Sequence, residues 1–137
     1  MKGLYLDTSA VLRAVIETGA TPDIEREIQA AELLITSRLS LVETSRALIR
    51  ARNTDALSER QLADAERELN AIWDRCEIWE LSKSVCESAR QVAPTQNLRA
   101  LDAIHLATYL LARRRFEGLE LLTADERMRS ATRAIAV

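Results

Sequence analysis

The chain has 137 residues, of which 47% are hydrophobic and 29% are charged, and its formal net charge is −2. This composition predicts one globular domain, residues 1–137, with a substantial core. A charge so close to neutral excludes a dedicated DNA-coating protein. Only two of the 19 basic residues, Lys2 and Lys83, are lysines. The excess of arginine agrees with phosphate recognition and equally with a compositional bias of the genome.

In chain order, short apolar strands alternate with helices. The pattern predicts a strand at residues 4–6, helices at 9–17 and 22–31, a strand at 32–36, helices at 38–52 and 58–74, a strand at 77–81, helices at 82–92 and 99–115, a strand at 120–123, a helix at 125–131 and a possible last strand at 134–137. Capping patterns at Ser58–Gln61 and Ser82 mark two helix starts. This alternation indicates an α/β domain whose central, mainly parallel sheet has four or five short strands.

Neither a targeting segment nor a membrane anchor is expected. The N-terminal stretch MKGLYLDTSAVL has an acid within a short apolar run, unlike a secretory signal. The apolar stretch at 98–112 carries Arg, Asp and His and is too short to span a bilayer. Two cysteines, Cys76 and Cys86, make no disulfide framework or metal-ligand pair. We therefore expect reduced thiols, a cytoplasmic location and no membrane partner.

Three carboxylates stand where a predicted strand gives way to a helix, and each has a purely structural alternative. Asp7 follows the first strand and could be an N-cap. Glu43 lies early in the predicted helix 38–52, which follows the second strand, and it could form a capping box with Ser40. Asp125 could be a first-turn acid behind a capping box at Thr123–Glu126. The carboxyl ends of parallel strands share one edge, where ligands bind, so we expect the three acids together.

Asp102 lies in the first turn of the most apolar helix, where a charge is unusual. The helix dipole offsets only about 0.3–1 kcal/mol, and an unpaired buried carboxylate costs far more. Asp102 therefore needs a partner, either Arg99 or a bound cation. Clustered carboxylates stay ionised only when a positive charge neutralises them. Mg²⁺ or Mn²⁺ suits such oxygen ligands and supports phosphodiester hydrolysis.

Other kinds of site fit the sequence less well. The one histidine, His105, excludes a histidine-based zinc site and a two-histidine nuclease, and it is expected to be packed or hydrogen-bonded. The chain has no G-x-S-x-G elbow and no glycine-rich phosphate loop. A phospho-receiver domain is the rival on fold grounds. It needs an acidic pair at the first strand and a lysine after the last strand, and this chain has neither.

Four segments resemble, in order and context, the acidic motifs of PIN-domain nucleases, and most nearly those of VapC-type toxins from bacterial toxin–antitoxin pairs. They are YLDTSAVL, SLVETSRAL, LRALDAIHLA and LLTADERM, and the resemblance extends over residues 4–128. The resemblance implies a PIN-like α/β/α sandwich with helices on both faces of the sheet. It also implies an endoribonuclease that depends on Mg²⁺ or Mn²⁺ and is inhibited by a small cognate antitoxin. Homodimers or toxin–antitoxin hetero-oligomers are the implied assemblies.

The same resemblance assigns roles to particular residues. The catalytic, metal-binding carboxylates would be Asp7, Glu43, Asp102 and Asp125, with Asp125 bound directly or through water. Ser9 and Thr123 match polar positions that would support them.

Two surfaces are predicted to meet partners. Arg46 and Arg50 follow Glu43 by three and seven residues on the same helix, so we predict that they contact RNA; a solvated helix face is the alternative. The helices between residues 24 and 72 are rich in Leu, Ile and Ala and could hold an amphipathic antitoxin helix; ordinary core packing is the alternative.

Two other functions share these features. A PIN-type nuclease of RNA processing would have no antitoxin, and a small-protein gene directly upstream would favour the toxin instead. A non-catalytic binding module on the same fold would have no reason to collect four acids, and it would fail to bind Mn²⁺.

Overall fold

The computed structural model describes residues 2–17 and 21–135, and its centre is a four-stranded parallel sheet. The strand order is β3-β2-β1-β4. Leu4 pairs with Leu34 of β2 on one side and with Glu120 of β4 on the other. The strands are β1 (Gly3–Leu6), β2 (Leu33–Ser37), β3 (Cys76–Trp79) and β4 (Glu120–Leu122). The predicted parallel sheet is confirmed, with four strands among the described residues.

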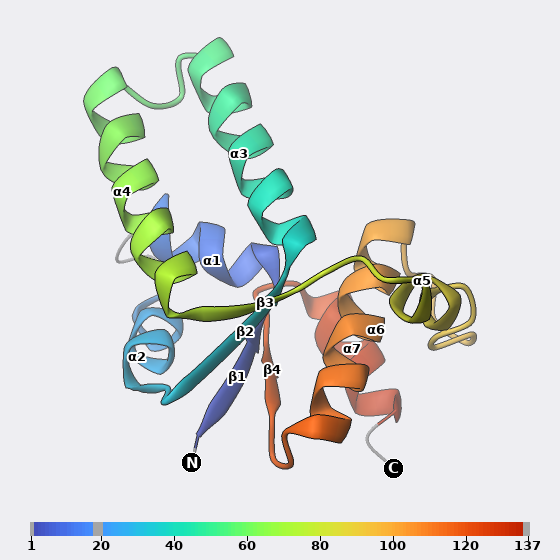
Figure 1. Ribbon diagram of the computed structural model, residues 1–137. Coiled ribbons are helices and arrows are strands. Elements are labelled where there is room, and N and C mark those ends of the chain that lie inside the picture. Colours follow the sequence, from blue (N-terminus) through green and yellow to red (C-terminus); the bar gives the residue numbers. More distant parts are fainter. Residues whose placement is uncertain (1, 18–20, 136–137) are drawn as a thin grey trace.

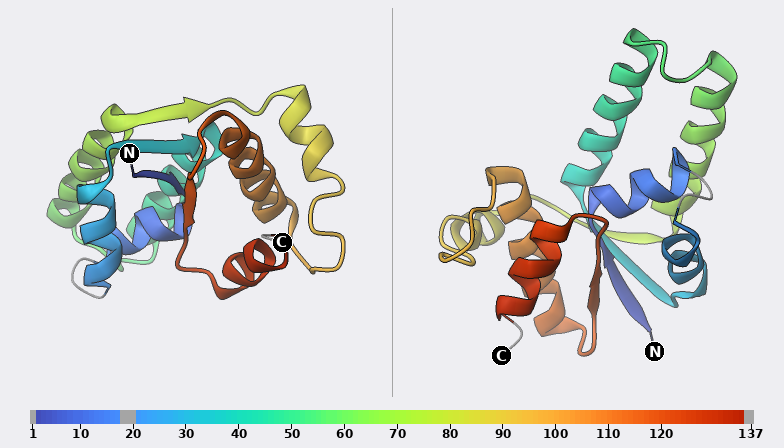
Figure 2. Two further views of the ribbon diagram at one scale, coloured as in Figure 1. Left: turned by 90° about the horizontal axis from the view of Figure 1, so that it is seen from below. Right: turned by 180° about the vertical axis from the view of Figure 1, so that it is seen from behind.

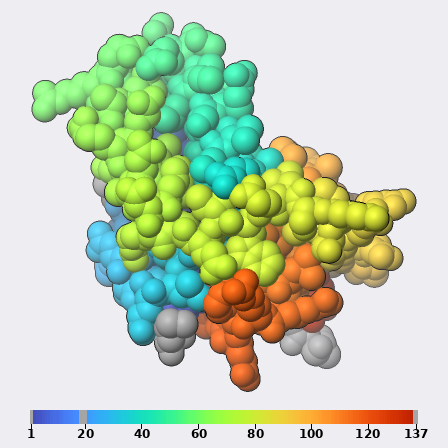
Figure 3. All heavy atoms as spheres, viewed as in Figure 1, coloured from blue at the N-terminus to red at the C-terminus, as the bar shows by residue number. Residues whose placement is uncertain are grey.

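Helices cover both faces of this sheet, as the view from below shows (Figure 2). One side carries α1 (Thr8–Val15), α2 (Pro22–Ala30), α3 (Arg38–Asn53) and α4 (Glu59–Arg75). The other side carries α5 (Lys83–Ala89), α6 (Ala100–Arg115) and α7 (Glu126–Ile135). The α/β/α sandwich is confirmed, and α3 and α4 project beyond the sheet as a pair (Figures 1 and 3). Within the described ranges no helix is long and apolar enough to cross a membrane.

Alternation along the central strands builds a core on each face of the sheet. Leu4 and Leu6 pack with α1–α4, whereas Tyr5 between them packs with α6 and α7. In β2, Leu34 and Ile35 divide in the same way. Full burial of such a side chain contributes about 1.5–3 kcal/mol. The alternation along β1 therefore places Tyr5 on the face covered by α6. Asp7, two residues later, follows the last residue of the strand.

The helix starts agree with their capping patterns, whereas the predicted last strand is wrong. Ser58 and Gln61 form the reciprocal capping box, and Ser82 accepts the Val85 N–H. Residues 134–135 continue α7, and residues 136–137 lie outside the described part. The helical spacing of Met128, Ala131 and Ile135 presents all three to the core below α7. The helical conformation thus lets Ile135 pack against the same cluster as Met128 and Ala131.

The two cysteines, Cys76 and Cys86, are free thiols in different surroundings. Cys86 is exposed on α5, whereas burial raises the pKa of the Cys76 thiol to about 12. Since the thiolate is the reactive form, we expect one thiol to react promptly with Ellman's reagent at pH 8. The Cys86→Ser variant should lose that fast phase, and Cys76→Ser should keep it. A fast phase that survives in Cys86→Ser would contradict the raised pKa of the Cys76 thiol.

Candidate active site

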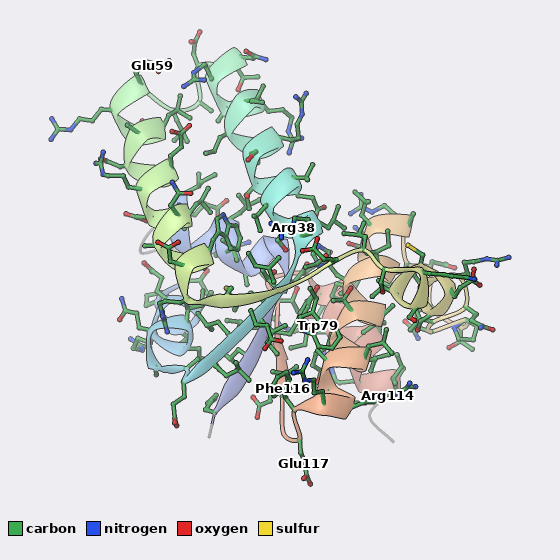
Figure 4. All side chains as sticks on the ribbon, viewed as in Figure 1. Arg38, Glu59, Trp79, Arg114, Phe116 and Glu117 are labelled. Carbon is green, nitrogen blue, oxygen red and sulfur yellow. The ribbon has the colours of Figure 1, made fainter. Side chains whose placement is uncertain are left out.

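The carboxyl ends of the strands place the predicted site residues along one edge of the sheet. Asp7 follows β1 directly, and Thr123 follows β4. β2 runs straight into α3, which carries Glu43 in its second turn, and Figure 4 labels Arg38 at the start of this helix. The first turn of α6 carries Asp102.

Asp7 is buried and bound by hydroxyl groups from two other positions. Its side chain is 6% exposed. Thr123 Oγ1 donates to Asp7 Oδ2 at 2.6 Å, and Ser9 Oγ donates to the same oxygen at 3.0 Å. Asp7 occupies the N-cap position of α1, but its side chain makes no capping hydrogen bond. The capping alternative therefore leaves the carboxylate unexplained, and Ser9 and Thr123 lie where a supporting role requires them.

Glu43 does not cap its own helix. α3 begins at Arg38, and Ser37 is its cap, accepting the Leu39 N–H at 3.0 Å. The alternative of a capping box between Ser40 and Glu43 is therefore wrong, because Ser40 already lies inside the helix.

Two donors from other elements hold the Glu43 carboxylate instead. Thr8 Oγ1 donates to Glu43 Oε1 at 2.7 Å, and His105 Nε2 lies 2.6 Å from the same oxygen. Burial alone would raise the pKa of Glu43, but these two hydrogen bonds and the electrostatic attraction of His105 together lower it. These contacts therefore favour the ionised form of Glu43.

Acidification tests this arrangement in metal-free protein. Because the pKa of folded Glu43 is lowered, its contribution to stability is present above the unfolded pKa of about 4.3 and is lost as pH falls through the folded pKa. We expect the wild type to lose free energy of unfolding relative to Glu43→Gln as the pH falls below about 4.3. Urea titrations in EDTA at several pH values measure this difference. A constant difference over that range would contradict the lowered pKa.

His105 links the elements that carry these acids. Its side chain is 1% exposed, and Nε2 is also 4.0 Å from Asp7 Oδ1. Tyr5 Oη lies 2.8 Å from Nδ1 on the other side of the ring. Burial and the nearby Asp7 raise the pKa of Tyr5 well above its ordinary value, so the phenol stays protonated.

The hydroxyl of Thr8 extends this network to β2. Thr8 Oγ1 lies 3.2 Å from Ser40 Oγ, which is 2.8 Å from Thr36 Oγ1. Sequence reasoning missed the parts played by Tyr5 and Thr8. The available signals were a hydroxyl in the middle of a buried strand and a second hydroxyl within the D-T-S segment.

Asp102 has the unusual environment that its sequence position predicts. Its Oδ2 is the only buried side-chain polar atom without a hydrogen-bond partner in the described part of the chain. Arg99 Nε lies 3.5 Å away, but the Arg99 side chain is 70% exposed. Leaving such a group unsatisfied costs about 1–3 kcal/mol, and more for a charge. The ion pair with Arg99 is present, but it does not satisfy the buried oxygen.

Asp125 acts as a helix cap in this structure. Its Oδ1 accepts the Arg127 N–H at 2.9 Å, at the start of α7. Its own N–H donates to Thr123 Oγ1 at 3.0 Å. Because α7 begins at Glu126 and the Glu126 carboxylate binds Arg129 and Arg133, the proposed Thr123–Glu126 capping box is wrong. Asp125 therefore caps α7 and is not an acid of its first turn, and this cap accounts for one of its two oxygens. Thr123 joins Asp125 to Asp7, because it also donates to that carboxylate.

These contacts link Asp7 and Glu43 through one side chain, whereas Asp102 and Asp125 are connected to them only through neighbouring residues. Asp7 and Glu43 meet through His105, Asp125 approaches through Thr123, and Asp102 lies one helical turn before His105. No three His, Cys, Asp or Glu side chains of the described residues form a ready metal-binding group. The four-acid metal site therefore stays a prediction. The all-oxygen donor set and the orphaned Asp102 Oδ2 fit a hard cation.

The predicted RNA contacts, Arg46 and Arg50, are exposed on α3. Their spacing from Glu43 places them along its side of the helix, roughly 4.5 and 10 Å further along the axis. Their role stays a prediction.

A parallel α/β/α sandwich with acids at the carboxyl edge of its strands defines a known class of domain. The family model described as "PIN domain" matches residues 4–134, and the chain belongs to this family. Ribonuclease VapC35 of Mycobacterium tuberculosis is 36% identical, over 98% of this chain and 93% of that protein.

Solved structures agree on the fold. PAE2754 from Pyrobaculum aerophilum superposes with a TM-score of 0.66 at 20% identity, covering 95% of this chain and 79% of that one. A toxin–antitoxin complex from Klebsiella pneumoniae gives a TM-score of 0.62 at 20% identity, covering 89% of this chain and 86% of that one.

Proposed function

We propose that this protein is a metal-dependent endoribonuclease and the toxin of a toxin–antitoxin pair. The PIN family and a relative named as a ribonuclease support the activity. The observation that carries the proposal is the buried Asp102 oxygen without a hydrogen-bond partner, one helical turn before His105, whose ring contacts Asp7 and Glu43. A cation would satisfy that oxygen and balance the clustered negative charge.

The proposed metal is Mg²⁺ or Mn²⁺, held by Asp7, Glu43 and Asp102, with Asp125 acting directly or through water. When bound, such an ion lowers the pKa of a coordinated water and stabilises the charge that develops on the phosphate. The chain's own residues prepare the site: Ser9 and Thr123 fix the orientation of Asp7 by donating to Oδ2.

RNA would reach this edge across α3. Arg46 and Arg50 are exposed there, and guanidinium groups bind phosphate oxygens bidentately. A toxin that cleaves cellular RNA acts in the cytoplasm, so that location belongs to the same proposal.

The antitoxin would bind in the groove between α1, α2 and α4. Two adjoining cavities make up this groove, and both are lined by Val15 and Glu68. Acidic side chains rim it, among them Glu17, Asp64 and Glu68. The partner that fits is an amphipathic helix with an apolar stripe flanked by basic residues.

Charge reversal tests this groove with the cognate small protein as the probe. Glu68→Arg is expected to slow association and reduce its dependence on salt, because a rim charge mainly affects the rate of encounter. Glu117→Arg, an exposed position at the far end of α6 (Figure 4), is the matched control. Surface plasmon resonance at two salt concentrations measures both. Equal effects of the two variants would place the partner elsewhere.

The central experiment is cleavage of total cellular RNA by antitoxin-free protein with Mn²⁺, Mg²⁺ or EDTA. Discrete fragments that require a metal would support the nuclease, and end mapping would then identify the target. The same cleavage by a protein that has no small-protein gene directly upstream of its own gene would favour the alternative of an RNA-processing nuclease. Absence of both cleavage and metal binding would favour a non-catalytic binding module.

A further inference from the structure

His105 is the only histidine of the chain, and the proposed chemistry gives it no part. Both ring nitrogens lie at hydrogen-bond distance from a polar group, Tyr5 Oη at 2.8 Å and Glu43 Oε1 at 2.6 Å. The ring is buried, with 1% of its side chain exposed. A polar ring that is buried and bonded on both sides is fixed in orientation.

The hydrogen-bonding partners of the His105 ring show which ring nitrogen must be protonated. The ionised Glu43 carboxylate can only accept, so the nitrogen 2.6 Å from it must donate. Nε2 therefore carries a proton. Tyr5 Oη, 2.8 Å from Nδ1, holds the opposite side of the ring. The opposite tautomer would set a nitrogen lone pair against the carboxylate.

We infer that His105 is a positioning residue for Glu43: held by Tyr5, it donates from Nε2 to Oε1 and so fixes the carboxylate that faces the proposed metal. This inference rests on the proposed function, because that function assigns Glu43 to the cation. Thr8 donates to the same oxygen at 2.7 Å. Both contacts are made to Oε1, so this oxygen anchors the carboxylate.

The contact between His105 and Glu43 connects the elements that carry the proposed metal ligands. Tyr5 and Asp7 are two residues apart at the end of β1, and Asp102 and His105 are one turn apart on α6. The chain from Tyr5 through His105 to Glu43 therefore ties β1, α6 and α3 together at the level of the acids. Hydrogen-bonding partners of ligating carboxylates typically contribute about 10–100-fold to metal affinity.

The first test reads the proton directly in metal-free protein. Because the chain has one histidine, ¹⁵N-histidine labelling gives the NMR signals of a single ring. We expect a protonated Nε2 at neutral pH, a changed Nε2 signal in Glu43→Gln and a changed Nδ1 signal in Tyr5→Phe. An unprotonated Nε2, or an Nε2 signal indifferent to Glu43→Gln, would overturn the inference without involving metal or RNA.

The second test measures Mn²⁺ binding by electron paramagnetic resonance of the free ion. We expect His105→Ala to weaken binding about 10–100-fold and His105→Gln to recover much of the loss, because the glutamine amide can donate from nearly the same point. Tyr109→Phe is the matched control: it removes a buried hydrogen bond to the Leu119 carbonyl from the same helix without touching Glu43. It should lower stability but leave the Mn²⁺ affinity unchanged.

The outcomes distinguish failure of the role inferred for His105 from failure of the proposed metal-dependent function. If the wild type binds Mn²⁺ and His105→Ala binds equally well, His105 is only a packed core residue and the proposed function stands. If His105→Ala fails to fold, His105→Gln and Tyr5→Phe carry the comparison in its place. A wild type that binds no Mn²⁺ would overturn the metal site itself, and the inference with it.

Discussion

Asp7→Asn is expected to slow RNA cleavage by about 100- to 1000-fold while leaving the fold intact. A metal that polarises a phosphate contributes several kcal/mol to the transition state, and each 1.36 kcal/mol is a tenfold change in rate. Asn keeps the shape of Asp7, and its carbonyl can still accept from Ser9 and Thr123, which both bind Oδ2. The substitution therefore removes the charge that would hold the metal and little else. Single-turnover cleavage of a mapped RNA target measures the loss.

A matched control separates charge at the site from charge in general. Glu117→Gln also removes one negative charge, but at an exposed position beyond the far end of α6 (Figure 4). It should cleave at the wild-type rate. Thermal melts in EDTA should place both variants close to the wild type. An Asp7→Asn protein that melts normally and cleaves normally would remove Asp7 from the proposed site.

The elements that place the acids were predictable from sequence for a simple reason. Leu4–Leu6 and Leu33–Ile35 are apolar runs buried on both faces, and such runs indicate the inner strands of a parallel sheet. Once those strands are parallel, Asp7 must lie at the edge where β2 passes into α3 and Glu43. The fold thus positions these residues through topology, which the alternation of strand and helix reveals.

Hydrogen bonds between distant residues could not be predicted, because one local sequence pattern is compatible with several structures. Ser40 and Glu43 fit a capping box as sequence letters, yet Ser40 lies inside the helix, which begins at Arg38 as predicted. The chain from Tyr5 to His105 spans 100 positions of sequence, and no local rule links them. The stretch from Ala134 is short and apolar, and periodicity alone does not distinguish a strand from a helix end. In the structure residues 134–135 continue α7, and Ile135 packs against the core.

Asp102→Asn is expected to abolish stabilisation by metal without lowering the stability of metal-free protein. In the wild type the buried Oδ2 lacks a hydrogen-bond partner, so the folded protein bears a cost that a bound cation would relieve. At a Mn²⁺ concentration 100-fold above its dissociation constant, the wild type should gain about 2.7 kcal/mol in free energy of unfolding. Asp102→Asn should gain almost nothing, and without metal it should equal or exceed the wild type, because a neutral amide costs less to bury than a charge.

The competing account, an ion pair with Arg99, predicts the opposite result. If the pair at 3.5 Å accounted for Asp102, Arg99→Gln and Asp102→Asn would lower metal-free stability alike and Mn²⁺ would stabilise both. The Arg99 side chain is 70% exposed, and exposed ion pairs contribute only about 0–1 kcal/mol. We therefore expect Arg99→Gln to unfold within about 0.5 kcal/mol of the wild type and to keep its full response to Mn²⁺. Urea unfolding of the three proteins, with EDTA and with Mn²⁺, decides whether Asp102 is there for an arginine or for a cation.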